Sequence, residues 1–159
     1  MKFLEIITKY HAKSAGVRKY FWRLIRKLLI YFLNDPDTFF LFDNKKLKIP
    51  LSHAAPEYLN IFKFYDRLPS RMSNFFVKQN IDIICIDIGA NIGDSIAYFD
   101  FHKKKSSRFL AIEPNTKFFD YLKYNWGSDE RVSSLKIACS SENRTINASF
   151  DEKNGTANI

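Results

Sequence analysis

One stretch limits the fold of this chain more than any other: residues 85–99, CIDIGANIGDSIAYF. The apolar run Ile81–Ile88 is typical of a strand, and a turn containing Gly89 and Gly93 follows it. A helical pattern then begins over Ser95–Phe101. The alternation continues with the basic loop Lys103–Ser107, the strand Arg108–Ile112, the helix Asn115–Trp126 and the strand Val132–Ile137. This order predicts a parallel, doubly wound α/β sheet.

The first of these strands is apolar on both faces, which suits a strand covered on both sides inside a parallel sheet. If its neighbours lie on one side only, we expect an open apolar edge that invites pairing with another chain. A fourth strand is predicted over Thr145–Phe150, paired with residues 156–159 across the turn Lys153-Asn154-Gly155.

The chain before residue 81 has a different character. Residues 1–80 hold 15 Lys and Arg against 6 Asp and Glu, a net charge of +9, whereas residues 81–159 hold 10 against 11, a net charge of −1. We therefore divide the chain into a basic helical segment (1–33), an extension of short strands and helices (34–80) and an α/β part (81–159).

Residues 17–33 show helical periodicity. The predicted apolar stripe consists of Val17, Phe21, Leu24, Ile25, Leu28, Leu29, Phe32 and Leu33. Lys19, Arg23, Arg26 and Lys27 are assigned to the opposite face. Two interpretations stay open: the stripe packs on its own domain or a partner, or the helix lies on an anionic membrane surface. We expect no nucleic-acid binding, because no zinc-finger, RRM or KH pattern occurs.

The helix is expected to end at Asn34-Asp35-Pro36-Asp37. Two short strands follow, Phe39–Phe42 and Lys46–Ile49, around the turn Asp43-Asn44. Residues 56–80 are predicted to form one or two helices, interrupted near Pro69. No run in 1–33 is long enough to cross a bilayer, and the two cysteines form no disulfide framework, so we expect a cytoplasmic protein, with membrane-peripheral placement as the alternative.

Three nucleotide-site patterns compete for the glycine turn. The Walker A loop requires a lysine after its second glycine, and none follows Gly93. The dinucleotide pattern requires a glycine where this chain has Asn91, whose side chain obstructs the approach of pyrophosphate. The third pattern suits a nucleoside ligand that carries no phosphates. A further alternative is that the turn binds nothing and is only a tight connection between strand and helix.

Two carboxylates favour the nucleoside. Asp87 precedes Gly89, and Glu113 ends the next strand, 20 residues beyond Gly93, where an acid commonly binds ribose hydroxyls. Carboxylates would repel phosphate but suit ribose and a cationic group, both of which S-adenosylmethionine (SAM) contains. Gly89 and Gly93 are expected to leave room for the ligand.

These residues resemble the FkbM-type SAM-dependent methyltransferases. The similarity covers about residue 47 to the C-terminus and is carried by Ile86–Ser95 (first motif), Ala111–Asn115 (second motif), Leu122–Asn125, Lys136–Ser140, Ile49–His53 and Tyr65-Asp66. The resemblance implies a Rossmann-like (class I) fold, SAM as cofactor, and O-methylation of a sugar or related hydroxyl in polysaccharide or natural-product pathways.

By position, the resemblance implies that Asp87, Gly89, Asn91 and Gly93 contact the methionine part of the cofactor. Glu113, with Asn115 beside it, would hold the ribose, and Ala138, Cys139 and Ser140 would lie near adenine. No catalytic base and no metal ligand are assigned. His53 and Asp66 could act as a general base by their chemistry, but a structural role is the more common one for such residues.

The chain also departs from this family. Such enzymes usually have seven strands and an Asp-Val-Glu-Gly-like stretch near the substrate, to which nothing here corresponds, so we expect a truncated methyltransferase domain that is inactive alone. Two alternatives stay open: an NAD-dependent oxidoreductase, and a non-enzymatic membrane-surface or interaction protein that acts through residues 17–33.

Overall fold

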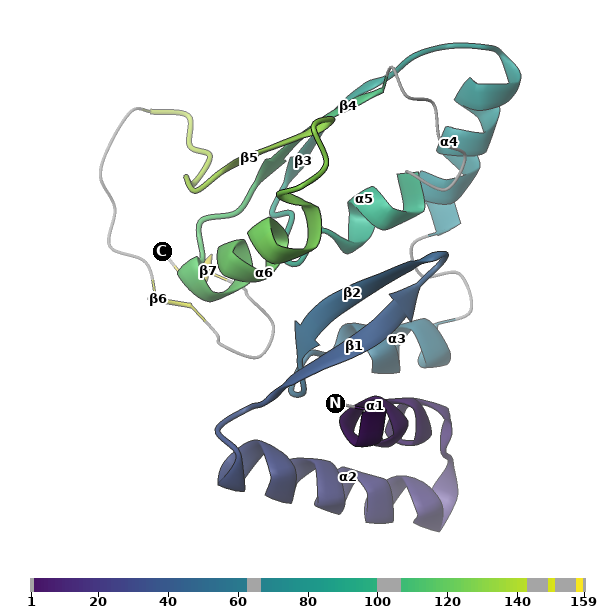
Figure 1. The fold of residues 1–159 in the computed structure, drawn as a ribbon, viewed down its shortest axis with the longest axis vertical. Coiled ribbons are helices and arrows are strands. Elements are labelled where there is room, and N and C mark those ends of the chain that lie inside the picture. Colours follow the sequence, from purple (N-terminus) through teal and green to yellow (C-terminus); the bar gives the residue numbers. More distant parts are fainter. Residues whose placement is uncertain (1, 63–66, 100–106, 143–148, 151–156, 159) are drawn as a thin grey trace. The chain divides into compact units, whose positions relative to one another are not determined.

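The computed structural model describes residues 2–62, 67–99, 107–142, 149–150 and 157–158. The chain divides into two compact units (Figure 1). Unit 1 contains residues 1–41 and 46–65, and unit 2 contains residues 42–45 and 66–159.

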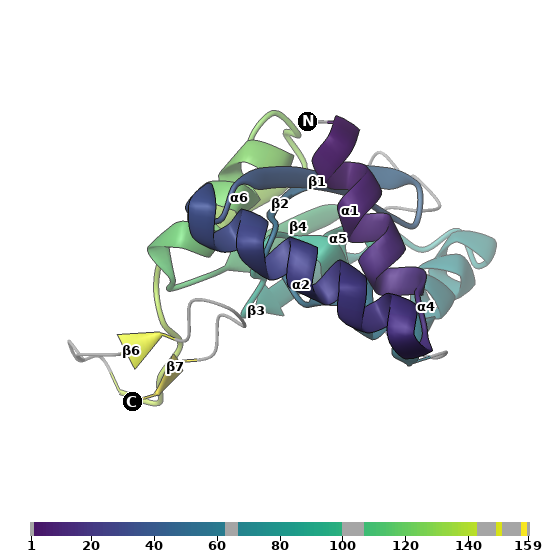
Figure 2. The same cartoon turned by 90° about the horizontal axis from the view of Figure 1, so that it is seen from below.

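The described residues of unit 1 form the helices α1 (Lys2–Lys13), α2 (Gly16–Phe32) and α3 (Ala55–Ile61). Helix α1 contacts both α2 and α3, and Figure 2 shows α1 crossing α2. The helix predicted over 17–33 is confirmed as α2. It ends where predicted, because Asn34 and Asp35 adopt positive φ angles of 52° and 54° that a helix cannot continue.

The predicted pair of short strands is also confirmed. Strands β1 (Asp37–Phe42) and β2 (Lys45–Pro50) form a two-stranded sheet, and Asp43 in the turn between them has a φ of 51°. Leu47, Ile49 and Leu51 are at most 1% exposed and contribute to the core of unit 1. Alternation along β2 therefore places apolar side chains inward.

Of the interpretations left open for the stripe of α2, packing of the whole stripe on its own domain is not found. Lys19 and Arg26, assigned to the face opposite the stripe, are only partly exposed and bind groups of unit 1. Most of the predicted apolar stripe is exposed instead, and no residue of α2 is buried. The physical reason is that polar partners for the two cations lie inside unit 1, as described below.

The first helix of unit 2 is α4 (Arg67–Lys78), whose first turn contains Pro69. A proline is tolerated there because the first N–H groups of a helix have no partner within the helix. The break predicted near Pro69 therefore falls before it, between α3 and α4. The remaining elements are β3 (Ile84–Ile88), α5 (Asp94–Phe99), β4 (Arg108–Ile112), α6 (Thr116–Trp126), β5 (Val132–Leu135), β6 (Ser149–Phe150) and β7 (Ala157–Asn158).

Strands β3, β4 and β5 form a parallel sheet in that order, with Ile86 beside Leu110 and Leu110 beside Ser133. The predicted βαβαβ arrangement is confirmed. Strands β6 and β7 pair antiparallel, Ser149 with Asn158 and Phe150 with Ala157, as predicted for the last hairpin. The turn predicted between them and the basic loop at 103–106 lie outside the described residues.

The predicted double winding and two-sided cover are not found in the described part of the sheet. Helices α5 and α6 lie on the same face (Figure 1), as expected when two crossovers of one hand step in the same direction. On the other face, Ile84, Ile86 and Ile88 are 83%, 60% and 65% exposed. Strand β3 is the edge strand, so the open apolar edge considered from the sequence is present among the described residues.

The covered face forms the core of unit 2. Phe109 and Ala111 of β4 are buried there, together with side chains of both crossover helices: Ile96, Ala97, Phe118, Leu122 and Trp126. Cys85 of β3 is only half-buried, and burial raises the pKa of its thiol. Both cysteines of the chain are free.

Candidate functional site

The turn after β3 has an unusual backbone. Gly89, Asn91 and Gly93 adopt φ angles of +81°, +50° and +83°. Glycine enters this left-handed region freely, and asparagine is among the few other residues that tolerate it. The alternation turns Ala90 and Ile92, which are at most 1% exposed, into the core and fixes the path from β3 to α5.

The backbone N–H groups of the turn bind acceptors within unit 2. Those of Gly89 and Ala90 both donate to the Ile112 carbonyl, at 2.9 and 3.0 Å. Asn91 N donates to Glu113 Oε2 at 2.8 Å, and Gly93 N donates to the Ala90 carbonyl at 2.7 Å. In phosphate-binding loops such groups point at the anion. Here four of them are already used inside the protein.

Glu113 connects the turn to the loop after β4. Its side chain is buried, with 3% exposed; besides the bond from Asn91, its Oε1 accepts a hydrogen bond from Asn115 N at 2.8 Å. Burial raises the pKa of Glu113, and the two backbone donors partly offset that rise. One carboxylate thus holds two loops at the carboxyl end of the sheet.

The two glycines of the turn have different roles. A Cβ atom at Gly93 would lie 2.3 Å from Trp126 Nε1, whereas a Cβ at Gly89 would meet nothing within 4 Å. The expectation that both leave room for a ligand is therefore wrong at Gly93, because the indole of Trp126 fills that space. Only Gly89 borders open space.

Sequence reasoning missed the part that α6 plays in the turn. Trp126 Nε1 donates to the Gly93 carbonyl at 2.9 Å, and Asn125 Nδ2 donates to the Ile92 carbonyl at 3.0 Å. From the sequence, Trp126 is predicted only as the last residue of the helix Asn115–Trp126. Its place at the last turn of α6, with one polar N–H to satisfy, was the signal available.

The other predicted site residues are placed as follows. Asp87 lies on β3, half-buried, beside Ala111 of β4. Asn115 is the N-cap of α6, where its Oδ1 accepts a hydrogen bond from Phe118 N at 3.3 Å. Ala138 and Cys139 are exposed in the segment beyond β5. The contacts described for the turn come from β4, from Glu113 directly after it, and from α6.

His53 belongs to unit 1 and has a local structural role. Its Nδ1 accepts a hydrogen bond from Ala55 N at 3.3 Å, at the start of α3. Asp66 lies outside the described residues. Within the parts of the chain that the structure describes, no group of three or more His, Cys, Asp or Glu residues is placed to hold a metal ion.

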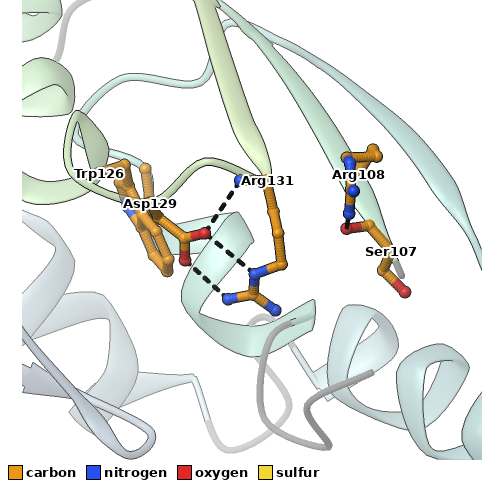
Figure 3. Close-up of polar contacts among 6 residues, drawn as sticks. Ser107, Arg108, Trp126, Asp129 and Arg131 are labelled. Carbon is orange, nitrogen blue, oxygen red and sulfur yellow. Dashed lines mark hydrogen bonds and ion pairs between the residues drawn. The ribbon is translucent and has the colours of Figure 1, made fainter. Parts of the chain in front are cut away.

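A hollow in unit 2 lies at the other end of the sheet, among the residues that precede or begin its strands. It is lined by Ile83, Ser107, Phe109 and Arg131 together with residues of α4 and α5. Figure 3 shows that Arg131 is paired with Asp129, through Nη2 to Oδ2 at 2.7 Å and Nε to Oδ1 at 3.0 Å. Its charge is therefore neutralised, and ligands of open α/β sheets bind at the carboxyl ends instead.

Comparison of the chain with protein-family models, with curated proteins and with solved structures gives no match. The structure therefore defines a mixed α/β fold with a parallel three-stranded sheet. A glycine-containing turn, held by internal hydrogen bonds, lies at the carboxyl ends of the strands.

Proposed function

We propose that residues 81–140 form the cofactor-binding part of a SAM-dependent methyltransferase that methylates a hydroxyl of a sugar or a related small molecule. The observation that carries the proposal is the internal hydrogen bonding of the turn. Four backbone donors between Gly89 and Gly93 are used within unit 2, so the turn offers little to a phosphate. This favours a nucleoside ligand without phosphates.

The same observation argues against the NAD alternative. A dinucleotide site needs free N–H groups and a close backbone approach to pyrophosphate. The Asn91 N–H instead binds the carboxylate of Glu113, and that carboxylate would repel an approaching phosphate.

The available residues fit the cofactor at three points. The open side of Gly89 allows close approach, and the carboxylate of Asp87, two residues earlier, suits the amino group of the methionine part. Glu113 retains acceptor capacity beyond its two N–H bonds, which suits ribose hydroxyls. Because Glu113 is only 3% exposed, binding of ribose requires the two loops to part slightly.

SAM supplies an electrophilic methyl group on a sulfonium. The role assigned to this chain is to bind and orient SAM. Asp87 binds the amino group of the methionine part, Gly89 allows the close approach of the ligand, and Glu113 accepts hydrogen bonds from the ribose hydroxyls. Positioning alone accounts for much of the rate of such transfers. Ala138 and Cys139 would flank the adenine from beyond β5, and Gly93 acts through Trp126 to hold the turn.

The test is calorimetric titration of the full chain with S-adenosylhomocysteine and, separately, with NAD. We expect saturable binding of the first and none of the second, with affinity reduced about tenfold or more in Asp87→Asn as a charged hydrogen bond is lost. Asp120→Asn, on the exposed side of α6, is the matched control and should bind normally. A folded chain that binds NAD, or neither ligand, would contradict the proposal.

A further inference from the structure

One face of helix α2 makes polar and aromatic contacts with the rest of unit 1. Lys19 Nζ forms an ion pair with Glu57 Oε1 at 2.7 Å, and the Trp22 ring stacks on Tyr10 with centroids 5.1 Å apart. Arg26 donates through Nε to the Leu51 carbonyl at 2.8 Å and through Nη2 to the His53 carbonyl at 3.1 Å. These contacts fix which face of the helix is inward.

Figure 2 shows the whole length of α2 as a ribbon. An apolar stripe lies on the face of this helix opposite to the polar contacts. We call it the outer stripe: Val17, Phe21, Leu24, Leu28 and Phe32, which are 85%, 57%, 58%, 47% and 73% exposed. Their spacing of four, three, four and four residues places them on one side of the helix. Tyr20 and Tyr31, at 72% and 80% exposed, follow along one side of the outer stripe.

The charges beside the outer stripe identify its occupant. Helix α2 has no acidic residue, and its three basic residues outside the inner face, Arg18, Arg23 and Lys27, are exposed. By helical geometry, Arg18 and Lys27 lie on opposite flanks of the stripe, and Arg23 lies farther round the helix, beyond Lys27. A second copy of this helix would oppose cation to cation, whereas an anionic bilayer offers acyl chains for the stripe and negative headgroups for its flanks.

We propose that α2 docks in the plane of an anionic membrane surface, with the outer stripe in the acyl boundary and the flanking cations Arg18 and Lys27 among the headgroups. The tyrosines would lie at the interface, where amphipathic rings are favoured. Among the described residues, no helix is both long enough and apolar enough to cross a membrane. Peripheral docking requires no such helix, and it does not depend on the proposed methyl transfer.

Cosedimentation of the full chain with vesicles tests this. We expect binding to vesicles that contain phosphatidylserine, weaker binding to phosphatidylcholine alone, and release by salt. Leu24→Gln with Leu28→Gln should reduce partitioning about tenfold or more. Leu41→Gln is the matched control, since Leu41 of β1 is 60% exposed outside the stripe, and it should leave partitioning unchanged.

A charge variant separates the headgroup contribution. Arg18→Gln with Lys27→Gln should weaken binding to the anionic vesicles by about fivefold per charge and leave binding to neutral vesicles unchanged. Circular dichroism confirms that each variant is folded. Vesicle binding that is unaffected by the substitutions of Leu24 and Leu28 would overturn the proposal. Absence of vesicle binding, with a dimer that those changes dissociate, would also overturn it and assign the outer stripe to a second copy.

Discussion

Helix α6 buries Phe118, Leu122 and Trp126, each at most 1% exposed, whereas α2 buries no residue at all. Both helices combine aromatic, aliphatic and basic residues with helical periodicity. In α6 the apolar residues face the core, and in α2 many of them face away from it. Periodicity therefore locates a stripe without telling which way the stripe points.

The inner contacts of α2 explain the difference. Arg26 is held by two backbone carbonyls and Lys19 by a carboxylate, so both cations point at acceptor groups of unit 1. Helix α6 has its own polar anchor, because Trp126 combines a large apolar surface with an N–H that binds the Gly93 carbonyl. In both helices, an inward-facing side chain donates hydrogen bonds to backbone carbonyls of its own unit.

The same substitution in the two helices gives the largest expected contrast. Leu122→Ala should lower the free energy of unfolding by about 2–5 kcal/mol, because it leaves a cavity in the core of unit 2. Leu24→Ala should change it by no more than about 0.5 kcal/mol, because Leu24 is exposed. Urea unfolding followed by circular dichroism measures both. Similar losses would mean that Leu24 is buried in solution.

A second contrast tests the contact of α6 with the turn. Gly93→Ala should cost about 3 kcal/mol, since a positive φ and a clash with the Trp126 indole act together. Gly89→Ala, at nearly the same φ but facing open space, should cost about 1–2 kcal/mol. The same urea experiment ranks them, and a larger loss at Gly89 would contradict the assigned packing of Trp126.

The smallest effect concerns the ion pair on the inner face of α2. The hydrogen bond from Lys19 lowers the pKa of Glu57, so the stabilisation is present above the ordinary value of 4.5 and is lost as the pH falls through the lowered folded-state value. Glu57→Gln should therefore cost about 0.5 kcal/mol near neutral pH and nothing in strong acid. Thermal melts of both proteins across this range check it. A difference that persists in acid would assign the effect to packing.

Local patterns predicted much of the fold. The bounds of β4 agree with prediction, β3 begins three residues later than predicted, and β5 ends two residues earlier. The first hairpin and α6 are also as expected. These features depend on alternation, helical spacing and turn residues, which act between near neighbours in the chain.

Contacts between distant residues could not be predicted in this way. Trp126 and Gly93 are 33 residues apart, and Arg26 and Leu51 are 25 apart, so no local pattern relates them. At the candidate site, the spacing of Glu113 from the turn anticipated their proximity. It did not anticipate that the carboxylate would be enclosed and bound to two loops, because that depends on how β3 and β4 align.

The carboxylate of Glu113 couples the turn after β3 to the loop after β4. The backbone N–H groups of Asn91 and Asn115 bind the two oxygens of the same Glu113 carboxylate. A motion that draws this carboxylate away therefore releases both N–H groups. Their amide protons would then exchange with solvent in a correlated way rather than independently. Any molecule that competes for this carboxylate would loosen the start of α5 and the start of α6 in one event.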